Sequence, residues 1–285
     1  MRANRWPRQP AGHTFWQEIT DLQRAALYKV GVHRYRPART TCSLAEANLA
    51  VLTRGWARLE IRTSSIDYTV MDLAGPGELL SPLHILDPHP PHWLGTAGLL
   101  HYTMLTKGNV LEVPRGAAMA LLNDFPRMLG LILQIQTGQH HLALHEQASR
   151  RLPAEARLAG LVLSLLYRYG DSNGPDSKQF ALTAPLSQRD LAVWIGASEA
   201  SVTRTIRKWR RSGLITTGRR FLSILNPRGL AAIAVPDSAD HSIAPAARDR
   251  RTSPEPYWLA TLKGRQATSQ GLVINSDLPP GLSRS

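Results

Sequence analysis

Short runs of alternating apolar and polar residues dominate the first part of the chain and predict β-strands. The runs are separated by turn residues such as Gly75–Pro76–Gly77 and Lys107–Gly108–Asn109. The predicted strands are Asn48–Leu52, Ala57–Ile61, Tyr68–Leu73, Tyr102–Leu105 and Val110–Val113. Several short strands separated by Gly and Pro are typical of a barrel or double-sheet β fold. We therefore expect a β domain over residues 14–122, preceded by a flexible arm at 1–13.

The apolar spacing changes after residue 122 and predicts a long helix over 123–151. Asn123 or Asp124 is expected to cap this helix, with Pro126 in its first turn, where a missing N–H is harmless. The apolar positions form a narrow seam with a 3-4 spacing of the coiled-coil kind. The seam consists of Phe125, Met128, Ile132, Ile135 and Leu142, with Gln139 as its polar member. This pattern favours a parallel homodimer, and packing of the helix on its own domain is the alternative.

A second apolar helix is predicted after a hinge at Pro153. It ends at Gly170 and is followed by a polar loop over 171–179. One side of the helix carries Leu158, Leu161, Val162, Leu165 and Leu166. Periodicity is lost after Pro236, so residues 236–285 are expected to form a disordered tail. A second domain is thus predicted over 152–235.

The stretch from Leu186 to Leu225 predicts a helix-turn-helix. Ser187 and Asp190 are spaced as a helix cap, and Gly196 permits the positive φ that a tight turn between helices needs. Ser198 is placed to cap the next helix, whose buried side is expected to carry Val202, Ile206 and Trp209. Ala192 is the small residue expected where the two helices cross. Two short helices joined by about three residues are typical of this motif.

The other face of the second helix is strongly basic. Between Glu199 and Arg220 the chain has seven basic residues and one acidic residue. Such a helix suits contact with phosphates, with its first turns reaching base edges. The segments Ile215–Thr217 and Phe221–Leu225 are expected to form a β-hairpin wing around Arg219 and Arg220. The alternative is an ordinary solvated helix face.

Charge and composition then limit the function classes. The net charge of +13 and pI near 10.6 indicate a polyanionic partner, either nucleic acid or an anionic membrane surface. No apolar stretch approaches the roughly 20 residues of a membrane span, and no amphipathic helix has a bulky apolar face. No apolar run follows the basic N-terminus, so no secretory signal is expected. The single cysteine, Cys42, excludes an internal disulfide and fits a reducing cytosol.

The same residues resemble the Crp/Fnr family of bacterial transcription regulators. The stretch LSQRDLAVWIGASEASVTRTIRKWRRSGLI is similar to the family's helix-turn-helix, and FLSILNPRGLAAIA is similar to its wing and closing helix. Upstream, MDLAGPGELL is similar to the family's β-roll motif, and LEVPRGAAMALLNDFP to its approach to the dimer helix. The resemblance covers residues 14–235. It implies an α+β chain with a jelly-roll β-roll of the cyclic-nucleotide-binding type, a long dimerisation helix and a C-terminal winged helix-turn-helix.

The resemblance also implies function and site residues. The chain is expected to bind palindromic promoter DNA as a homodimer, with RNA polymerase as a further partner. The base-reading turn is expected to hold Ser198, Glu199, Ala200 and Arg204. The full set of candidate DNA contacts is Ser187, Gln188, Ser198, Glu199, Ala200, Ser201, Arg204, Arg207, Lys208, Arg219 and Arg220. Many family members have Arg-Glu where this chain has Glu199–Ala200, so its operator is expected to differ.

The sensor half departs from the family pattern. Gly77, Glu78 and Leu79 match the family's effector turn, and His101 lies near the expected end of the effector site. However, no arginine occurs between Arg62 and Arg115 to pair with a phosphate. A buried phosphodiester without a cation is costly, so cAMP is not expected to bind in the usual way.

Other functions remain open at this stage. The histidines at 84, 89, 92 and 101 suggest a metal or haem site, although exposed histidines in a Pro-rich loop are the simpler interpretation. A nucleoid-type protein that binds DNA without sequence preference is a second alternative. An enzyme is not expected, because no nucleophile elbow, metalloprotease motif or phosphate loop is present.

Overall fold

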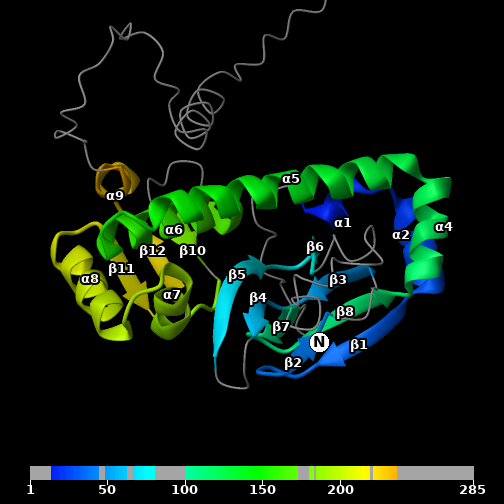
Figure 1. Cartoon of the computed structure of the whole chain (residues 1–285), viewed down its shortest axis with the longest axis horizontal. Helices are drawn as coiled ribbons and strands as arrows, with labels where there is room; N and C mark the ends of the chain where they lie inside the picture. Colours follow the sequence, from blue (N-terminus) through cyan, green and yellow to red (C-terminus); the bar gives the residue numbers. More distant parts are fainter. Residues whose placement is uncertain are drawn as a thin grey trace, which may run out of the picture. The chain divides into compact units, whose positions relative to one another are not determined.

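Two four-stranded antiparallel sheets form the first half of the structure (Figure 1). The computed structural model describes residues 14–44, 49–62, 67–80, 100–172, 180–182, 184–218 and 221–235. The sheets have the orders β1-β8-β3-β6 and β2-β7-β4-β5. Their strands are β1 (Val32–Arg36), β2 (Thr41–Ser43), β3 (Leu49–Arg54), β4 (Ala57–Arg62), β5 (Tyr68–Ala74), β6 (Glu78–Leu79), β7 (Leu100–Met104) and β8 (Gly108–Val113).

Strand β3 is buried on both of its faces. Its residues 49–52 are all buried, and they alternate between two hydrophobic clusters. Ala50 and Leu52 contribute to the cluster that includes residues of both sheets, whereas Leu49 and Val51 contribute to a cluster with the surrounding helices. A strand covered on both faces has a continuous apolar run.

Four helices pack around the first sheet. They are α1 (Phe15–Glu18), α2 (Asp21–Val30), α4 (Arg115–Asp124) and the 24-residue α5 (Pro126–Ser149). The side chain of Thr20 caps α2 by accepting a hydrogen bond from the Gln23 N–H at 3.3 Å. Helices α1 and α2 and strands β1 and β2 are not among the predicted elements.

The start of α5 differs from the prediction. Asn123 and Asp124 end α4, and Phe125 is the residue that precedes α5, with Pro126 at its first position. The predicted cap is therefore wrong, and the place of Pro126 is confirmed. Within the described residues no single helix is long and apolar enough to cross a membrane. Only α4 with the first part of α5 reaches that length and composition, and this pair is bent by 112°.

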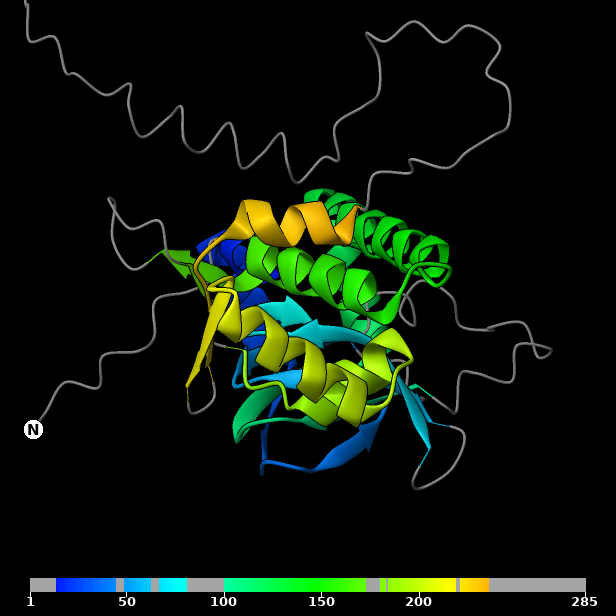
Figure 2. The same ribbon diagram turned by 90° about the vertical axis from the view of Figure 1, so that its left-hand side faces the viewer.

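The second half is a helical unit with a small sheet. It contains α6 (Ala154–Tyr169), α7 (Gln188–Ile195), α8 (Glu199–Arg211) and α9 (Pro227–Ala234). The sheet has the order β11-β12-β10-β9, from β9 (Gly170–Ser172), β10 (Phe180–Leu182), β11 (Ile215–Gly218) and β12 (Phe221–Ile224). Figure 2 shows α6 in green between α9 in orange and α8 in yellow. The apolar side predicted for α6 is buried, as expected.

Most of the predicted elements are present. The five predicted strands correspond to β3, β4, β5, β7 and β8, and the predicted wing corresponds to β11 and β12. Part of the predicted loop after Gly170 is instead strand β9, which pairs with β10. The expected arm at 1–13 and the expected tail at 236–285 lie outside the described residues.

Candidate nucleic-acid interface

Helices α7 and α8 are joined by a tight turn that the sequence specifies residue by residue. Ser187 caps α7 by accepting from the Asp190 N–H at 3.1 Å, and the Asp190 carboxylate accepts from the Ser187 N–H at 2.9 Å. Gly196 ends α7 with a left-handed φ of 62°, a conformation that favours glycine. Ser198 then caps α8 by accepting from the Ser201 N–H at 3.2 Å. The caps and the turn glycine were all predicted.

The inner face of α8 anchors this helix to the rest of the unit. Val202, Ile206 and Trp209 are buried, as the spacing predicts. The indole of Trp209 donates to the Glu155 carboxylate at 3.0 Å, and Lys208 lies 2.8 Å from the same carboxylate. Burial acts to raise the pKa of Glu155, but the bonds from Lys208 and Trp209 outweigh it and lower the pKa. The helix thus has a fixed orientation on α6.

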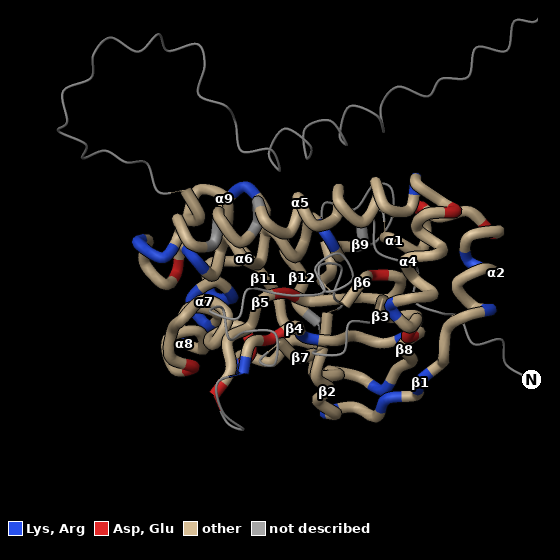
Figure 3. Tube along the Cα trace, turned by 45° about the vertical axis from the view of Figure 1, so that its right-hand side comes forward, with Lys and Arg blue, Asp and Glu red and all other residues tan. Residues whose placement is uncertain are grey.

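The outer face of α8 is basic and open. Figure 3 shows Lys and Arg along this helix, with one acidic position near its start. A shallow surface pocket of about 490 Å³ lies against this face. It is lined by Arg204, Arg207, Lys208, Arg211 and Ser212. Lys208 of this lining pairs with Glu155, and the three arginines beside it give the face a positive charge that is suited to a polyanion.

Comparison with known proteins identifies this part of the chain. Residues 156–233 match the family model of the Crp-like helix-turn-helix domain. This part of the chain is a Crp-like helix-turn-helix domain. No curated protein sequence matches the chain.

Solved structures show the same fold over most of the chain. A CooA mutant from Carboxydothermus hydrogenoformans is 12% identical, with a TM-score of 0.62 over 80% of this chain and 98% of the other. The c-di-GMP-responsive regulator CLP of Xanthomonas campestris is 15% identical, with a TM-score of 0.56 over 72% and 99%. A CRP/FNR-family transcriptional regulator of Thermus thermophilus is 18% identical, with a TM-score of 0.50 over 71% and 98%. The predicted Crp/Fnr resemblance and the β-roll fold are confirmed.

The candidate DNA contacts lie together on the surface of the Crp-like domain. Ser198, Glu199, Ala200, Arg204 and Arg207 are exposed at or in α8. Ser201 is half-buried, and Lys208 is exposed although it pairs with Glu155. Ser187 and Gln188 are exposed at the start of α7, where the Gln188 amide oxygen accepts a hydrogen bond from Thr203. Arg219 and Arg220 lie outside the described residues.

The turn that was predicted to bind an effector is in contact with the Crp-like domain. The Glu78 carboxylate accepts hydrogen bonds from the Gly75 N–H at 2.7 Å, from the Tyr169 hydroxyl at 2.7 Å and from Arg168 at 3.3 Å. Burial raises the pKa of Tyr169 well above its usual value, and the Glu78 carboxylate raises it further against the charge of Arg168. Gly77 has a φ of 89°, and Leu79 is buried. The sequence pattern did not indicate that Arg168 and Tyr169 contact Glu78.

The predicted histidine site is only partly covered by the structure. His101 lies in β7, paired in register with Ser43 and Glu60. The histidines at 84, 89 and 92 lie outside the described residues. Among the residues that the structure describes, no group of three or more His, Cys, Asp or Glu could hold a metal ion.

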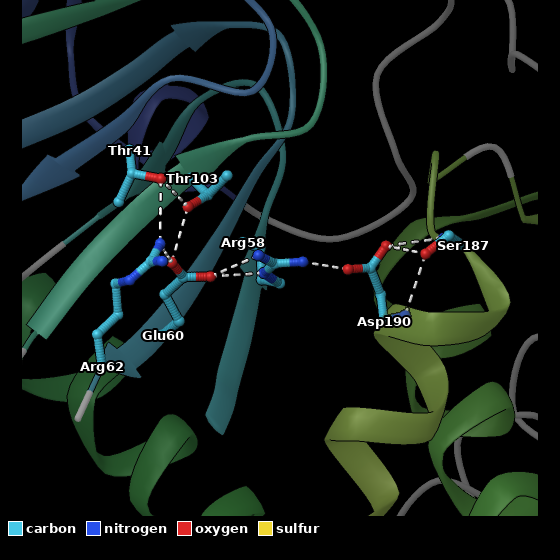
Figure 4. Close-up of polar contacts among 7 residues, drawn as sticks. All are labelled: Thr41, Arg58, Glu60, Arg62, Thr103, Ser187 and Asp190. Carbon is cyan, nitrogen blue, oxygen red and sulfur yellow. Dashed lines mark hydrogen bonds and ion pairs between the residues drawn. The ribbon is translucent and has the colours of Figure 1, made fainter. Parts of the chain in front are cut away.

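A buried charge network that the sequence analysis missed joins β4 to α7 (Figure 4). Arg58 in β4 forms ion pairs with Glu60 of the same strand, at 2.7 Å, and with Asp190 of α7. Glu60 is fully buried and also contacts Arg62 and Thr103, each at 2.8 Å. Burial disfavours the charge of Arg58, but the Glu60 and Asp190 carboxylates outweigh it, so the pKa of Arg58 is raised.

The predicted dimer seam requires a correction. Met128 and Ile132 are buried in the chain's own core, where Phe125 and Ile135 pack against the same cluster. Gln139 donates a hydrogen bond to Asp72 at 3.3 Å, and the side chain of Leu142 lies outside the described part. Met128 and Ile132 of the seam therefore pack on the chain's own domain, which was the alternative interpretation. Core atoms with no exposed surface cannot also bind a second chain.

A second series on α5, with the same 3-4 spacing, is exposed. It consists of Gly130, Leu133, Thr137, His140, Leu144 and Gln147. Leu133 and Leu144 are 48% and 49% exposed, among the most exposed large apolar side chains of the described residues. A Cβ added at Gly130 would meet no atom within 4 Å, so the backbone there is open to close approach. This face is exposed along α5, whereas Met128 and Ile132 of the predicted seam are buried.

Proposed function

We propose that the protein is a transcription regulator that binds specific duplex DNA as a homodimer, with α8 as its recognition helix. The observation that carries this proposal is the two-sided character of α8. The side chains on its inner face are buried against the rest of the Crp-like domain, and its outer face carries exposed basic side chains. A helix held this way lies in the major groove, with its first turns at the base edges.

The proposed contacts divide into base and phosphate contacts. Ser198, Glu199, Ala200 and Arg204 belong to the first turns of α8 and are proposed to read bases, with Arg204 bidentate to a guanine. Arg207 and Arg211, further along the helix, are proposed to bind phosphates. Ser187 and Gln188 begin the first helix, which crosses the DNA backbone in this motif. The wing residues Arg219 and Arg220 are proposed to contact the flanking backbone.

The proposed dimer uses the exposed series of α5. Pairing two α5 helices along Leu133 and Leu144 removes their apolar surface from water. It also relates two α8 helices by a two-fold axis, so that they read half-sites about 34 Å apart. The operator is then expected to be palindromic.

The sensor is proposed not to use cAMP in the usual manner. Glu78 is already bonded to Arg168 and Tyr169, and the sequence has no arginine between Arg62 and Arg115. A nucleotide at this turn would have to displace the hydrogen bonds made by the Crp-like domain, and Arg168, the cation that contacts Glu78, is already paired with both Asp72 and Glu78. The effector is either of another chemical class or absent.

The salt dependence of DNA binding tests the role of α8. Binding of the full chain to a duplex is measured by fluorescence anisotropy over a range of salt concentrations. Each phosphate contact that is lost reduces the slope of log K against log salt by about 0.9. We expect Arg207→Ala and Arg211→Ala each to reduce the slope, and Arg127→Ala, exposed at the start of α5, to leave it unchanged. Equal slopes for all three variants contradict the proposal.

A further inference from the structure

Glu199 is the one acidic residue of the described helix α8, and it occupies the first position of that helix. The residue is exposed, and Figure 3 shows this acidic position near the start of the Lys and Arg side chains of α8. A carboxylate on a surface that faces phosphates weakens the general attraction to DNA. Its presence there therefore requires a specific explanation.

An ion pair within α8 does not account for Glu199. On a helix, the residues three and four positions further on are the nearest side-chain neighbours. Val202 is buried, and the hydroxyl of Thr203 donates a hydrogen bond to the amide oxygen of Gln188. The first cation of the helix is Arg204, five positions away and on another side of the helix. Among the described residues, the Glu199 carboxylate thus has no partner on its own helix.

The cap of α8 does not depend on Glu199 either. The side chain of Ser198 accepts a hydrogen bond from the Ser201 N–H at 3.2 Å. In a capping box the carboxylate stands at the third helical position, which is Ser201 in this helix. A carboxylate at the first position interacts favourably with the helix dipole, and this stabilising role is the alternative to a role in binding.

The place of Glu199 brings it to the base edges when α8 lies in the major groove. The N-terminal residues of the second helix contact the bases in this motif. Glu199 and Arg204 are separated by a rise of about 7.5 Å along the helix axis. This distance corresponds to roughly two base-pair steps of about 3.4 Å. The two side chains therefore reach different base pairs of one half-site.

The four bases differ in what they offer to a carboxylate, which only accepts hydrogen bonds. In the major groove guanine presents two acceptors, and thymine presents an acceptor and a methyl group. Adenine presents an acceptor beside its amino group. Cytosine alone presents an amino donor without a neighbouring acceptor. A carboxylate at a base edge is thus bonded best by cytosine and is repelled by guanine.

We propose that Glu199 is a specificity-determining residue that accepts a hydrogen bond from the amino group of a cytosine in each half-site. The carboxylate lowers the affinity of α8 for DNA in general and favours sequences with cytosine at this position. Ala200, which follows it, is exposed and has no polar side-chain atom that would replace this contact. The proposal rests on the proposed function and deepens it by assigning one base of the operator.

Two substitutions at Glu199 test this assignment. Sequences bound by the full chain are selected from random duplex DNA with the wild type, Glu199→Ala and Glu199→Gln. We expect the wild type to favour cytosine at one position of each half-site by about fivefold or more over the other bases. Glu199→Ala is expected to lose this preference, and Glu199→Gln to shift it to adenine, whose amino group and N7 bond a Gln side chain together. The guanine opposite Arg204 is expected to remain in both variants.

Asp21→Asn is the matched control. Asp21 is the acidic first residue of α2, and its side chain is 97% exposed. Its substitution changes the net charge by the same amount as Glu199→Gln and removes an acid from the same position of a helix. We expect the selected sequences to remain those of the wild type.

A cytosine analogue that lacks the 4-amino group provides the second readout. Placed in the selected duplex, the analogue is expected to weaken binding of the wild type by about fivefold or more, and binding of Glu199→Ala much less. Equal weakening of both proteins contradicts a contact between Glu199 and the amino group.

The outcomes separate this assignment from the proposed function. If both Glu199 variants select the same sequences as the wild type, with at most a uniform rise in affinity, the proposal is overturned and the helix dipole accounts for Glu199. A wild-type preference for a base other than cytosine at the position that responds to Glu199 also overturns it. If the wild type binds duplex DNA without enriching any sequence, the proposed function fails, and the assignment of Glu199 fails with it.

Discussion

The hydroxyl of Tyr169 donates a hydrogen bond to the carboxylate of Glu78, with 2.7 Å between the oxygens. This bond connects the last residue of α6 to β6, the strand that begins at the turn predicted to bind an effector. The same hydroxyl lies 2.5 Å from the Leu73 carbonyl oxygen, and the Tyr169 ring packs edge-on against Trp56. The Crp-like domain and the sensor turn therefore share a buried polar contact.

Removal of the Tyr169 hydroxyl is expected to destabilise the protein. In Tyr169→Phe the Glu78 carboxylate loses a buried donor, which costs about 1–3 kcal/mol of unfolding free energy. Urea denaturation of the two proteins measures the difference. Tyr28→Phe, on a ring that is 46% exposed, is the control and is expected to change stability by less than about 0.5 kcal/mol. Equal stability of wild type and Tyr169→Phe would show that this bond contributes nothing.

The link between Glu155 and α8 is expected to depend on pH. Because the pKa of Glu155 is lowered in the folded protein, its stabilisation is present above the unfolded value of about 4.3 and is lost as pH falls through the folded pKa. Lys208 is 66% exposed, so solvent limits the contribution to below about 1 kcal/mol. Glu155→Gln is therefore expected to be less stable than the wild type at pH 7 and equally stable near pH 3. A difference that grows toward low pH contradicts this sign.

Dimerisation is expected to depend on the exposed face of α5. Leu133→Glu and Leu144→Glu place charges in the proposed helix pair, so sedimentation should show a shift from dimer to monomer. The control is Leu22→Glu in α2, where the native side chain is 69% exposed. A dimer that survives both α5 substitutions, or a wild-type monomer, contradicts the proposed interface.

Arg204 is expected to determine one position of the operator. Arg204→Ala removes a proposed base contact and should cost about 1–3 kcal/mol of binding free energy on the preferred sequence while relaxing one base position. Arg219→Ala, on the wing, should weaken binding to all sequences alike. Competition assays with specific and random duplexes distinguish the two. Equal loss on both duplexes for Arg204→Ala removes its assignment as a base-reading residue.

Local patterns predicted the elements whose signals lie within a few neighbouring residues. The helix-turn-helix depends on caps at Ser187 and Ser198 and on a glycine at 196, and all three occupy the predicted positions. The strands were found because Gly and Pro turns separate them. Helix α2 was missed although Thr20 and Gln23 form a capping box, because the surrounding region was interpreted as β structure.

Features that depend on distant partners were not predictable in this way. The 3-4 spacing of Met128 and Ile132 shows that this side of α5 is buried, but not whether the chain's own core or a second chain covers it. Asp190 was predicted as a capping residue, yet its partner Arg58 lies 132 positions away, and no local pattern connects them. Likewise, nothing near Glu78 in sequence indicates Arg168 or Tyr169.

Selection of bound sequences from random duplex DNA, with and without cAMP, tests whether the protein is a sequence-specific regulator that does not depend on cAMP. We expect enrichment of a palindrome with half-site centres about one helical turn apart, recovered equally well in both conditions. Enrichment only with cAMP would show that the sensor turn binds this nucleotide despite the bonds that Glu78 already makes. Binding without any enriched sequence would contradict the claim of a specific regulator and favour a nucleoid-type protein.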